Sequence, residues 1–340
     1  MRGTQVYVTT DLFCYSFEKE INLQVTFHKM NMGLNEFTSQ IDHAYSTYGP
    51  LTGSRLAVSK VVERVLAQAG SRINYGFRPL DHDWDVMIIL DACRADLFHE
   101  FAPEHPVYEI FDNVSSKYSC ASTSREWFKK GFGSEVDVSD VHYVTQNPFL
   151  PEKTDSNRFH DVEPLWNVDS ENESGRLEPS VVTDIALDAY ESTSADRFVV
   201  HYLPPHAPFL HCEGKYDLGE TSWGGDSHDV WFGLQINEFD KEEVWEDYGR
   251  NLLTVLDEVQ RLSKYVSGDI VVTADHANGI GEFGQYGHPG YVPVPAIKRV
   301  PWVEMIGKEQ EYDTRELQTI EAEEETEDQV QKRLESLGYV

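Results

Sequence analysis

The sequence predicts an α/β fold with a mostly parallel central sheet, flanked by helices in three layers. Short apolar runs alternate along the chain with longer segments in which apolar residues recur at helical spacing. One run, residues 85–90 (DVMIIL), is apolar after its first residue, which is typical of a parallel strand covered on both faces. Three of the runs end in acidic or histidine residues, as expected where the strands of an α/β protein reach a ligand site.

The expected elements follow one another from residue 54 onward. The first helix is expected over 54–69, because apolar residues recur every three or four positions and Gly70 provides a stop signal. Strands are expected at 85–90, 107–111, Val141–Thr145, Arg197–Tyr202 and Asp269–Thr273, and helices at 125–132, 180–192 and 241–266. This alternation favours one α/β domain over residues 55–308.

The two ends of the chain lack such a pattern. Residues 1–54 have weak periodicity and scattered turn formers, so we expect a poorly defined extension in which Met30 or Met32 is a possible start of translation. Residues 309–340 are expected to form an acidic tail with a short helix over 328–340. The long stretches 150–178 and 212–237 have no clear period, and they are either lids over a site or loose insertions.

The composition is strongly acidic, with 59 Asp and Glu residues against 28 Lys and Arg residues and a formal net charge of −31. One explanation is an acidic tail on an ordinary protein, and the other is adaptation to molar cytoplasmic salt, which screens charge over short distances. Because the acidic residues are spread along the whole chain, we favour the halophilic explanation. Nucleic acid is not expected as a partner, since phosphate binding needs a concentrated basic face.

The cysteines indicate no disulfide framework. The four of them, Cys14, Cys93, Cys120 and Cys212, show neither a CxxC pair nor metal-finger spacing. The sequence also contains no run of about 20 apolar residues and no signal-type apolar segment near its start. We therefore expect a soluble, cytoplasmic protein without a transmembrane segment, and no pattern indicates its oligomeric state.

Polar residues follow three of the apolar strands. Asp91 follows the run 85–90, His201 and His206 come at the end of the next such strand, and the pair Asp275–His276 ends the last. The carboxyl ends of parallel strands lie at one edge of a sheet, so these side chains are expected to meet. Two carboxylates and an imidazole suit Mg²⁺, Mn²⁺, Ca²⁺ or Zn²⁺. Taken singly, Asp91 is better explained as a helix N-cap and His206 as a structural histidine.

Several short motifs, in this order, resemble those of the alkaline phosphatase superfamily, specifically its sulfatase-like hydrolase branch in a halophilic archaeal form. They are Asp91-Ala-Cys-Arg94, Ala121-Ser-Thr-Ser-Arg125, His201-Tyr-Leu-Pro-Pro-His206, Thr273-Ala-Asp-His276, Tyr286-Gly-His288 and Val300-Pro301. The terminal Leu334-Glu-Ser-Leu-Gly-Tyr339 is similar to the tail of many sulfatase-like chains. The resemblance extends from Asp85 to the end, and it implies a metal-dependent hydrolase with the fold expected above.

The resemblance also implies roles for individual residues. Asp91, Asp275 and His276 would bind one divalent metal ion together with the nucleophile. In the family the nucleophile lies in a loop that starts a helix, here 119–127, where exposed N–H groups favour an anion. We prefer Ser124 as the nucleophile, with Thr123 as the alternative, although either hydroxyl is also explained as a helix cap.

Formylglycine is not expected at Cys120, because the Cys-x-Pro-Ser-Arg motif of sulfatases is absent. By resemblance, His206 and His288 would hold the oxygens of the anion and protonate the leaving oxygen. Arg94 would neutralise the same anion or form a structural ion pair. His201 would contact substrate or bind a second metal ion, and Asn147 is a further candidate for substrate contact.

The leading hypothesis is therefore a metal-dependent hydrolase of phosphate or sulfate esters. An unmodified Ser or Thr nucleophile favours phosphoesters, because formylglycine is the usual sulfatase device in this family. The expected substrate is a small anionic ester, such as a phosphodiester, a phosphomonoester, a decorated sugar or a lipid head group. The alternatives are a phosphoryl or phosphoethanolamine transferase, and a noncatalytic protein of the same fold that binds an anionic glycan or a partner protein.

Overall fold

The computed structural model describes residues 11–73, 75–167, 176–212, 214–216 and 230–310, with side chains from residue 38 onward. Contacts divide the chain into two units, Met1–Val58 and Ser59–Val340. Helix α1 (Asp11–Gly70) belongs in part to each, and it is interrupted at Gly49 (φ 75°, ψ 175°), which Pro50 follows. The helix expected over 54–69 is the last part of α1, which begins at Asp11.

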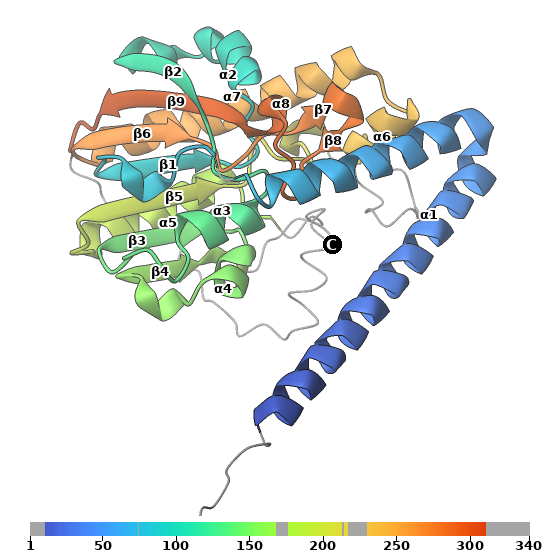
Figure 1. Cartoon of the computed structure of the whole chain (residues 1–340). Helices are drawn as coiled ribbons and strands as arrows, with labels where there is room; N and C mark the ends of the chain where they lie inside the picture. Colours follow the sequence, from blue (N-terminus) through green and yellow to red (C-terminus); the bar gives the residue numbers. More distant parts are fainter. Residues whose placement is uncertain (1–10, 74, 168–175, 213, 217–229, 311–340) are drawn as a thin grey trace, which may run out of the picture. The chain divides into compact units, whose positions relative to one another are not determined.

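The second unit is built on a seven-stranded sheet in the order β2-β9-β6-β1-β5-β3-β4 (Figure 1). The strands are β1 (Val86–Leu90), β2 (Asn113–Tyr118), β3 (Val141–Thr145), β4 (Asp161–Pro164), β5 (Arg197–Tyr202), β6 (Asp269–Thr273) and β9 (Arg299–Ile306). Strand β1 runs parallel to β5 and β6, and β3 runs parallel to β4 and β5, whereas β9 is antiparallel to β6 and β2. The predicted mostly parallel sheet is therefore confirmed.

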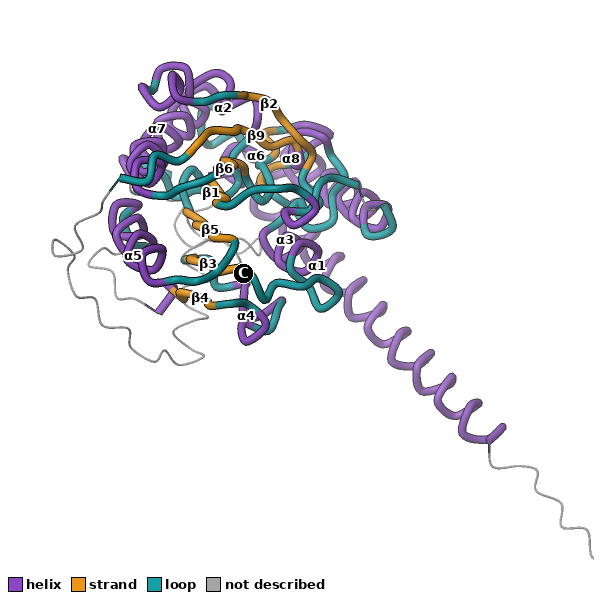
Figure 2. Tube along the Cα trace, turned by 90° about the vertical axis from the view of Figure 1, so that its left-hand side faces the viewer, coloured by secondary structure: helices purple, strands orange, loops and turns teal. Residues whose placement is uncertain are grey.

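Helices cover both faces of this sheet. The second unit holds α2 (Ala95–Phe101), α3 (Ser124–Gly131), α4 (Phe149–Lys153), α5 (Pro179–Ser192), α6 (Val230–Ile236), α7 (Lys241–Tyr265) and α8 (Pro295–Lys298), and a hairpin of β7 (Gly279–Ile280) and β8 (Tyr286–Gly287). Figure 2 shows α5 and α7 on one side of the sheet and α3 on the other, which gives the three predicted layers. Within the described residues, none of the helices combines the length and the hydropathy needed to traverse a bilayer.

Some predicted elements differ from the structure. The strand predicted at 107–111 is wrong, because Pro106–Ile110 forms a 3₁₀ helix whose first turn is capped by the His105 side chain. The edge strand begins instead at Asn113, and it escaped notice because NVSSKY is polar. The stretch 150–178 contains β4, which was not predicted. In the stretch 217–237 the structure describes residues 230–237, which contain α6. The helix expected over 328–340 lies outside the described residues.

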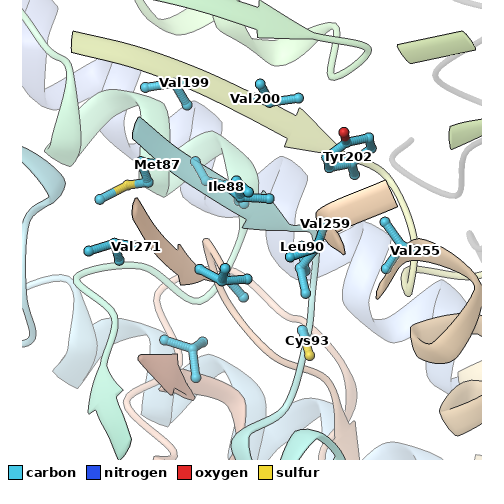
Figure 3. Close-up of a cluster of buried hydrophobic side chains, with 14 of the residues drawn as sticks. Met87, Ile88, Leu90, Cys93, Val199, Val200, Tyr202, Val255, Val259 and Val271 are labelled. Carbon is cyan, nitrogen blue, oxygen red and sulfur yellow. The ribbon is translucent and has the colours of Figure 1, made fainter. Parts of the chain in front are cut away.

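The core of the second unit fixes the strand ends that matter for the site. Strand β1 is buried along its whole length, and Figure 3 shows Met87 beside Val199 of β5, with Val255 of α7 close to Leu90. Burying each such side chain contributes about 1.5–3 kcal/mol. Register pairs Leu90 with Tyr202 across β1 and β5, so these two strands end side by side in a rigid environment.

Candidate metal centre and nucleophile

Four fully buried ionisable side chains meet at the carboxyl ends of three neighbouring strands. Asp91 follows β1, His201 is near the end of β5, and Asp275 and His276 follow β6. Each of the four is 0% exposed. The parallel pairing of β1 with both β5 and β6 brings them together, as the strand-end rule predicts. We call these four residues the strand-end cluster.

The distances within this cluster suit a bound cation. His201 Nε2 lies 3.4 Å from Asp91 Oδ2 and 4.0 Å from Asp275 Oδ2. His276 Nε2 lies 3.6 Å from Asp91 Oδ1 and 3.4 Å from Asp275 Oδ2. These contacts are longer than ordinary hydrogen bonds of about 2.7–3.2 Å. The four side chains thus surround a common point without satisfying one another fully.

The surrounding groups aim the ligand atoms inward. Asp275 Oδ1 accepts hydrogen bonds from the backbone N–H groups of Ala92 (3.1 Å) and His276 (2.9 Å), which leaves Oδ2 toward the cluster. His201 Nδ1 lies 3.1 Å from the Tyr143 hydroxyl, and His276 Nδ1 lies 3.2 Å from the Ala277 carbonyl. Partners of this kind orient metal-binding imidazoles. Both rings therefore present Nε2 to the cluster.

The pKa values of the two carboxyl groups are shifted in opposite directions. Burial alone would raise the pKa of Asp91, but contact with His201 and the nearby His206 and His276 outweigh it and hold that pKa well below its usual value. Burial and the charge of Asp91 raise the pKa of Asp275. Two carboxylates this close ionise together only at a cost, unless a cation lies between them. The residues present therefore fit a divalent metal ion.

Ser124 is the hydroxyl that the structure brings to the strand-end cluster. It begins α3, and its Oγ lies 2.7 Å from Asp275 Oδ2, 3.3 Å from His276 Nε2 and 3.4 Å from Asp91 Oδ2. Thr123 is the N-cap of the same helix, and its Oγ1 accepts a hydrogen bond from the Glu126 N–H at 3.2 Å. Of the two hydroxyls proposed as nucleophile, one is therefore in the cluster and the other caps the helix.

Cys120 lies in the same loop without sharing this environment. Its side chain is buried, and burial raises the pKa of its thiol to about 12. A thiol that remains protonated at neutral pH is a poor nucleophile.

His206 and His288 form a pair beside the cluster. Their Nε2 atoms lie 3.0 Å apart, and the His288 ring lies 4.5 Å from the His276 ring between centroids. His206 Nδ1 lies 2.5 Å from the Ala207 carbonyl, so Nδ1 carries the proton and Nε2 accepts from His288. Burial lowers the pKa of His206 to about 4, and burial together with the nearby His276 and His206 holds the pKa of His288 well below its usual value. Both rings are therefore neutral near pH 7, with one N–H shared between them.

Asn147 and Arg94, both proposed to touch substrate, lie in different surroundings. Asn147 Nδ2 donates to Asp91 Oδ2 at 3.0 Å, which places this amide directly on the strand-end cluster. Arg94 instead forms a two-point ion pair with Asp96 (2.9 and 2.6 Å) and a further pair with Glu282 (2.9 Å). Its guanidinium also donates a 2.6 Å hydrogen bond to the Asn278 carbonyl. For Arg94 the structural ion pair, the second of the two interpretations, is the arrangement found.

Glu126 is a buried acid that the sequence analysis missed. Its Oε2 accepts hydrogen bonds from the Ser122 N–H (2.9 Å), the Ser122 hydroxyl (2.6 Å) and the Tyr291 N–H (3.1 Å). Its Oε1 pairs with Lys130 Nζ at 2.8 Å. One carboxylate therefore joins the loop before Ser124 to the segment that follows His288. The spacing Thr123-x-x-Glu126, which is that of a capping box, was the available signal in the sequence.

A cavity of about 610 Å³ opens over Ser124 and His288. Three basic side chains line it, against two acidic ones, in a chain whose formal net charge is −31. The lining residues are Thr123, Ser124, Arg125, Glu126, Lys129, Phe149, Glu152, Lys153, His288, Gly290 and Tyr291. A basic lining in so acidic a chain favours an anion in this cavity.

No protein-family model and no curated protein matches the sequence. Among solved structures, the chain is similar to the soluble domain of lipooligosaccharide phosphoethanolamine transferase A from Neisseria meningitidis, with 13% identity over 69% of this chain and 80% of that chain and a TM-score of 0.45. It is also similar to the C-terminal periplasmic domain of phosphoethanolamine transferase EptC from Campylobacter jejuni (16%, 66% and 79%, TM-score 0.43). A third match is a protein in the alkaline phosphatase superfamily from Vibrio parahaemolyticus (13%, 78% and 72%, TM-score 0.37). At these identities and TM-scores, the three matches assign no family and no activity to this chain.

Proposed function

We propose that the chain is a metal-dependent enzyme of the alkaline phosphatase superfamily that cleaves phosphoesters, with Ser124 as its nucleophile. The observation that carries this proposal is the place of Ser124 Oγ, 2.7 Å from Asp275 Oδ2 inside the strand-end cluster and on the lining of the basic cavity. A serine that only capped its helix would accept a backbone N–H, and Thr123 already does so.

The residues suited to hold one divalent ion are Asp91, Asp275 and His276, with His201 as a further imidazole at the same point. Imidazole nitrogen in the donor set favours Zn²⁺ or Mn²⁺ over Ca²⁺, which prefers oxygen ligands. When bound, such an ion lowers the pKa of a nearby hydroxyl and neutralises an anionic ester.

The side chains then divide the chemistry among them. Ser124 Oγ gives its proton to the Asp275 carboxylate and forms a bond to phosphorus, while the bond from phosphorus to the alcohol oxygen breaks. His288 lines the cavity next to Ser124, so its imidazole is placed to contact an oxygen of the anionic ester. The departing oxygen takes its proton from water. A second hydroxyl compound then removes the phosphoryl group from Ser124.

Hydrolysis and transfer differ only in whether that second compound is water or an alcohol. The cavity of about 610 Å³ has room for either. We place hydrolysis first because it needs no second binding site, and we keep phosphoryl or phosphoethanolamine transfer as the alternative. Phosphoesters are favoured over sulfate esters because the hydroxyl of Ser124 is unmodified and the thiol of Cys120 is buried.

The test is a panel of nitrophenyl phosphates, phosphodiesters and sulfates in molar KCl with Mn²⁺, Mg²⁺, Ca²⁺ or Zn²⁺. We expect phosphoester turnover with at least one of these metals, and a loss of roughly 10³-fold or more in Ser124→Ala. The matched control is Thr123→Ala, which removes a helix cap worth about 1 kcal/mol and should retain most of the turnover. Mass spectrometry of acid-quenched enzyme should locate the phosphoryl group on Ser124.

Two outcomes would count against this proposal. If Ser124→Ala turned over as fast as the unaltered chain, another group would be the nucleophile. If no ester were cleaved with any metal, although a metal still bound at the strand-end cluster, the noncatalytic alternative would replace the enzyme. In that case the basic cavity would be a binding site for an anionic glycan or a partner protein.

A further inference from the structure

A second group of potential metal ligands lies at the outer edge of the sheet. His142 of β3 pairs in parallel register with Asp161 of β4, and Glu163 lies two residues farther along β4, on the same face as Asp161. One ligand atom from each of the three lies within 4.8 Å of the other two. We call these three residues the edge cluster. It shares no residue with the strand-end cluster.

His142 is the buried member of the edge cluster. It is 3% exposed, and its Nδ1 lies 3.0 Å from the Thr193 hydroxyl at the end of α5. Its Nε2 has no hydrogen-bond partner among the described residues, because Glu163 Oε1, at 3.8 Å, is too far. A buried polar atom left in this state costs free energy and calls for a partner.

An ordinary ion pair does not supply that partner. Glu163 Oε1 lies 3.8 Å from His142 Nε2, beyond the length of a hydrogen bond, so this pair leaves the nitrogen unsatisfied. In the tautomer that donates its Nδ1 proton to the Thr193 hydroxyl, the lone pair of Nε2 faces two carboxylates. A cation between them would satisfy all three groups.

The acidic residues lack a cation from the protein as well. In the described part of the chain, no Lys or Arg nitrogen lies within ion-pair distance of Asp161 or Glu163. Negative charge therefore accumulates at this edge without compensation.

We propose that His142 Nε2 and the carboxylates of Asp161 and Glu163 bind a divalent transition-metal ion of the zinc type. One imidazole nitrogen and two carboxylate oxygens, with water in the fourth position, form a donor set that Zn²⁺ accepts and that Ca²⁺ and Mg²⁺ do not favour. Bonds of about 2.0–2.2 Å would draw the ligand atoms together. Asp161 is exposed and the Glu163 side chain is 38% exposed, so both have room to move.

Such an ion would have a structural use. Strand β4 is the last strand on its side of the sheet, and edge strands depend on few neighbours. The ion would connect β4 to β3, and through Thr193 it would connect β3 to the end of α5. Thr193 would orient the imidazole in the way that outer partners of metal ligands do.

A third group, His211, Cys212 and Asp247, has similar spacing but a different environment. Lys215 Nζ and the Tyr216 hydroxyl both contact Asp247 Oδ2, the latter at 2.6 Å. The lysine ammonium already provides the positive charge there. This contrast is the reason for assigning the additional ion to the edge cluster.

The test is the number of zinc ions bound per chain, measured by equilibrium dialysis against ZnCl₂ in molar KCl without chelator. We expect His142→Ala to bind one zinc ion fewer than the unaltered chain, with phosphoester turnover unchanged. Asp161→Asn and Glu163→Gln alter exposed or half-exposed side chains and should fold normally, so they serve if His142→Ala does not. Each should raise the Kd of that ion at least tenfold.

The matched control is His160→Ala, which removes an exposed neighbouring histidine whose Nε2 lies 3.4 Å from the Ser194 hydroxyl. It should bind as much zinc as the unaltered chain. X-ray absorption at the zinc edge of an Asp275→Asn chain should show one nitrogen and two carboxylate oxygens at the remaining ion. The proposal is overturned if His142→Ala, Asp161→Asn and Glu163→Gln all keep the zinc count and Kd of the unaltered chain.

Discussion

The strand-end cluster and the edge cluster use the same residue types in opposite surroundings. In the former, Asp91 and Asp275 are 0% exposed at the centre of the sheet, and backbone N–H groups fix one oxygen of Asp275. In the latter, only His142 is buried, while Glu163 can turn toward water. Loss of a cation therefore leaves the first cluster with a charge conflict that it cannot relax. In the second cluster, water can solvate the carboxylates and relieve the same conflict. The strand-end cluster is therefore suited to catalysis, and the edge cluster to a structural metal ion.

The largest effect is expected in the strand-end cluster, where buried carboxylates cannot turn toward water. Asp275→Asn should reduce phosphoester turnover by roughly 10³-fold or more, because it removes a metal ligand and the partner of Ser124. It should also raise the free energy of unfolding of the metal-free chain by about 1 kcal/mol, since one buried carboxylate is gone. Activity assays and denaturant melts measure the two. A metal-free variant less stable than the unaltered chain would contradict the charge conflict.

A smaller effect is expected one contact away from the strand-end cluster. Glu126→Gln keeps the size of the side chain but loses charge toward Lys130 and the Ser122 and Tyr291 donors. Because it loosens the loops that carry Ser124 and His288, we expect kcat to fall by roughly 10- to 100-fold with KM little changed.

The control for Glu126 is Glu152→Gln, which alters a more exposed carboxylate on the same cavity. Its kcat should stay within about twofold of the unaltered chain, as for most surface substitutions. Equal losses in the two variants would show that the cavity charge, and not the position of the loops, is the cause.

The edge cluster is expected to respond more weakly to the loss of its own supporting contact. Thr193→Val removes the hydroxyl that meets His142 Nδ1, and it should raise the Kd of the edge zinc ion by about tenfold. Ser192→Ala is the matched control, because the Ser192 hydroxyl bonds only to carbonyls of α5. Zinc titrations of the two variants measure the difference. An unchanged Kd in Thr193→Val would remove the supporting role of this residue.

The smallest effect concerns the stability of the whole chain, including both clusters, as the salt concentration changes. With a formal net charge of −31, the chain should repel itself at low ionic strength. We expect the melting temperature to rise by several degrees between dilute and molar KCl, because a Debye length of about 3 Å at 1 M screens the repulsion. Calorimetry in a KCl series measures this. A flat or falling melting temperature would contradict the halophilic proposal.

The strand-end cluster was predictable because the carboxyl ends of parallel strands lie at one edge of a sheet. Once 85–90 and Asp269–Thr273 are taken as parallel strands, Asp91 and Asp275 must lie at the same edge of the sheet. The edge cluster was not predictable in this way, since β4 is a four-residue strand with the polar sequence DVEP. Without that strand, nothing in the sequence brings His142 beside Asp161.

The choice between the two hydroxyls shows a different limit. The sequence places Thr123 and Ser124 next to each other, and either suits a helix start. Their roles separate only when the helix begins at Ser124, because side chains at the cap and at the first helical position point in different directions. Helix boundaries assigned from sequence are uncertain by one or two residues, and a shift of one residue here exchanges the roles of Thr123 and Ser124.

The adjacent positions Thr123 and Ser124 should differ in the substitutions that they tolerate. Since the helix obtains its terminal hydrogen bond from Thr123, that position should accept Ser, Asn or Asp, each of which offers a similar acceptor. Ser124 does not cap the helix, so its substitution would alter reactivity while leaving the helix intact. A library randomised at these two codons should therefore tolerate variety at the first and reveal a strict requirement at the second.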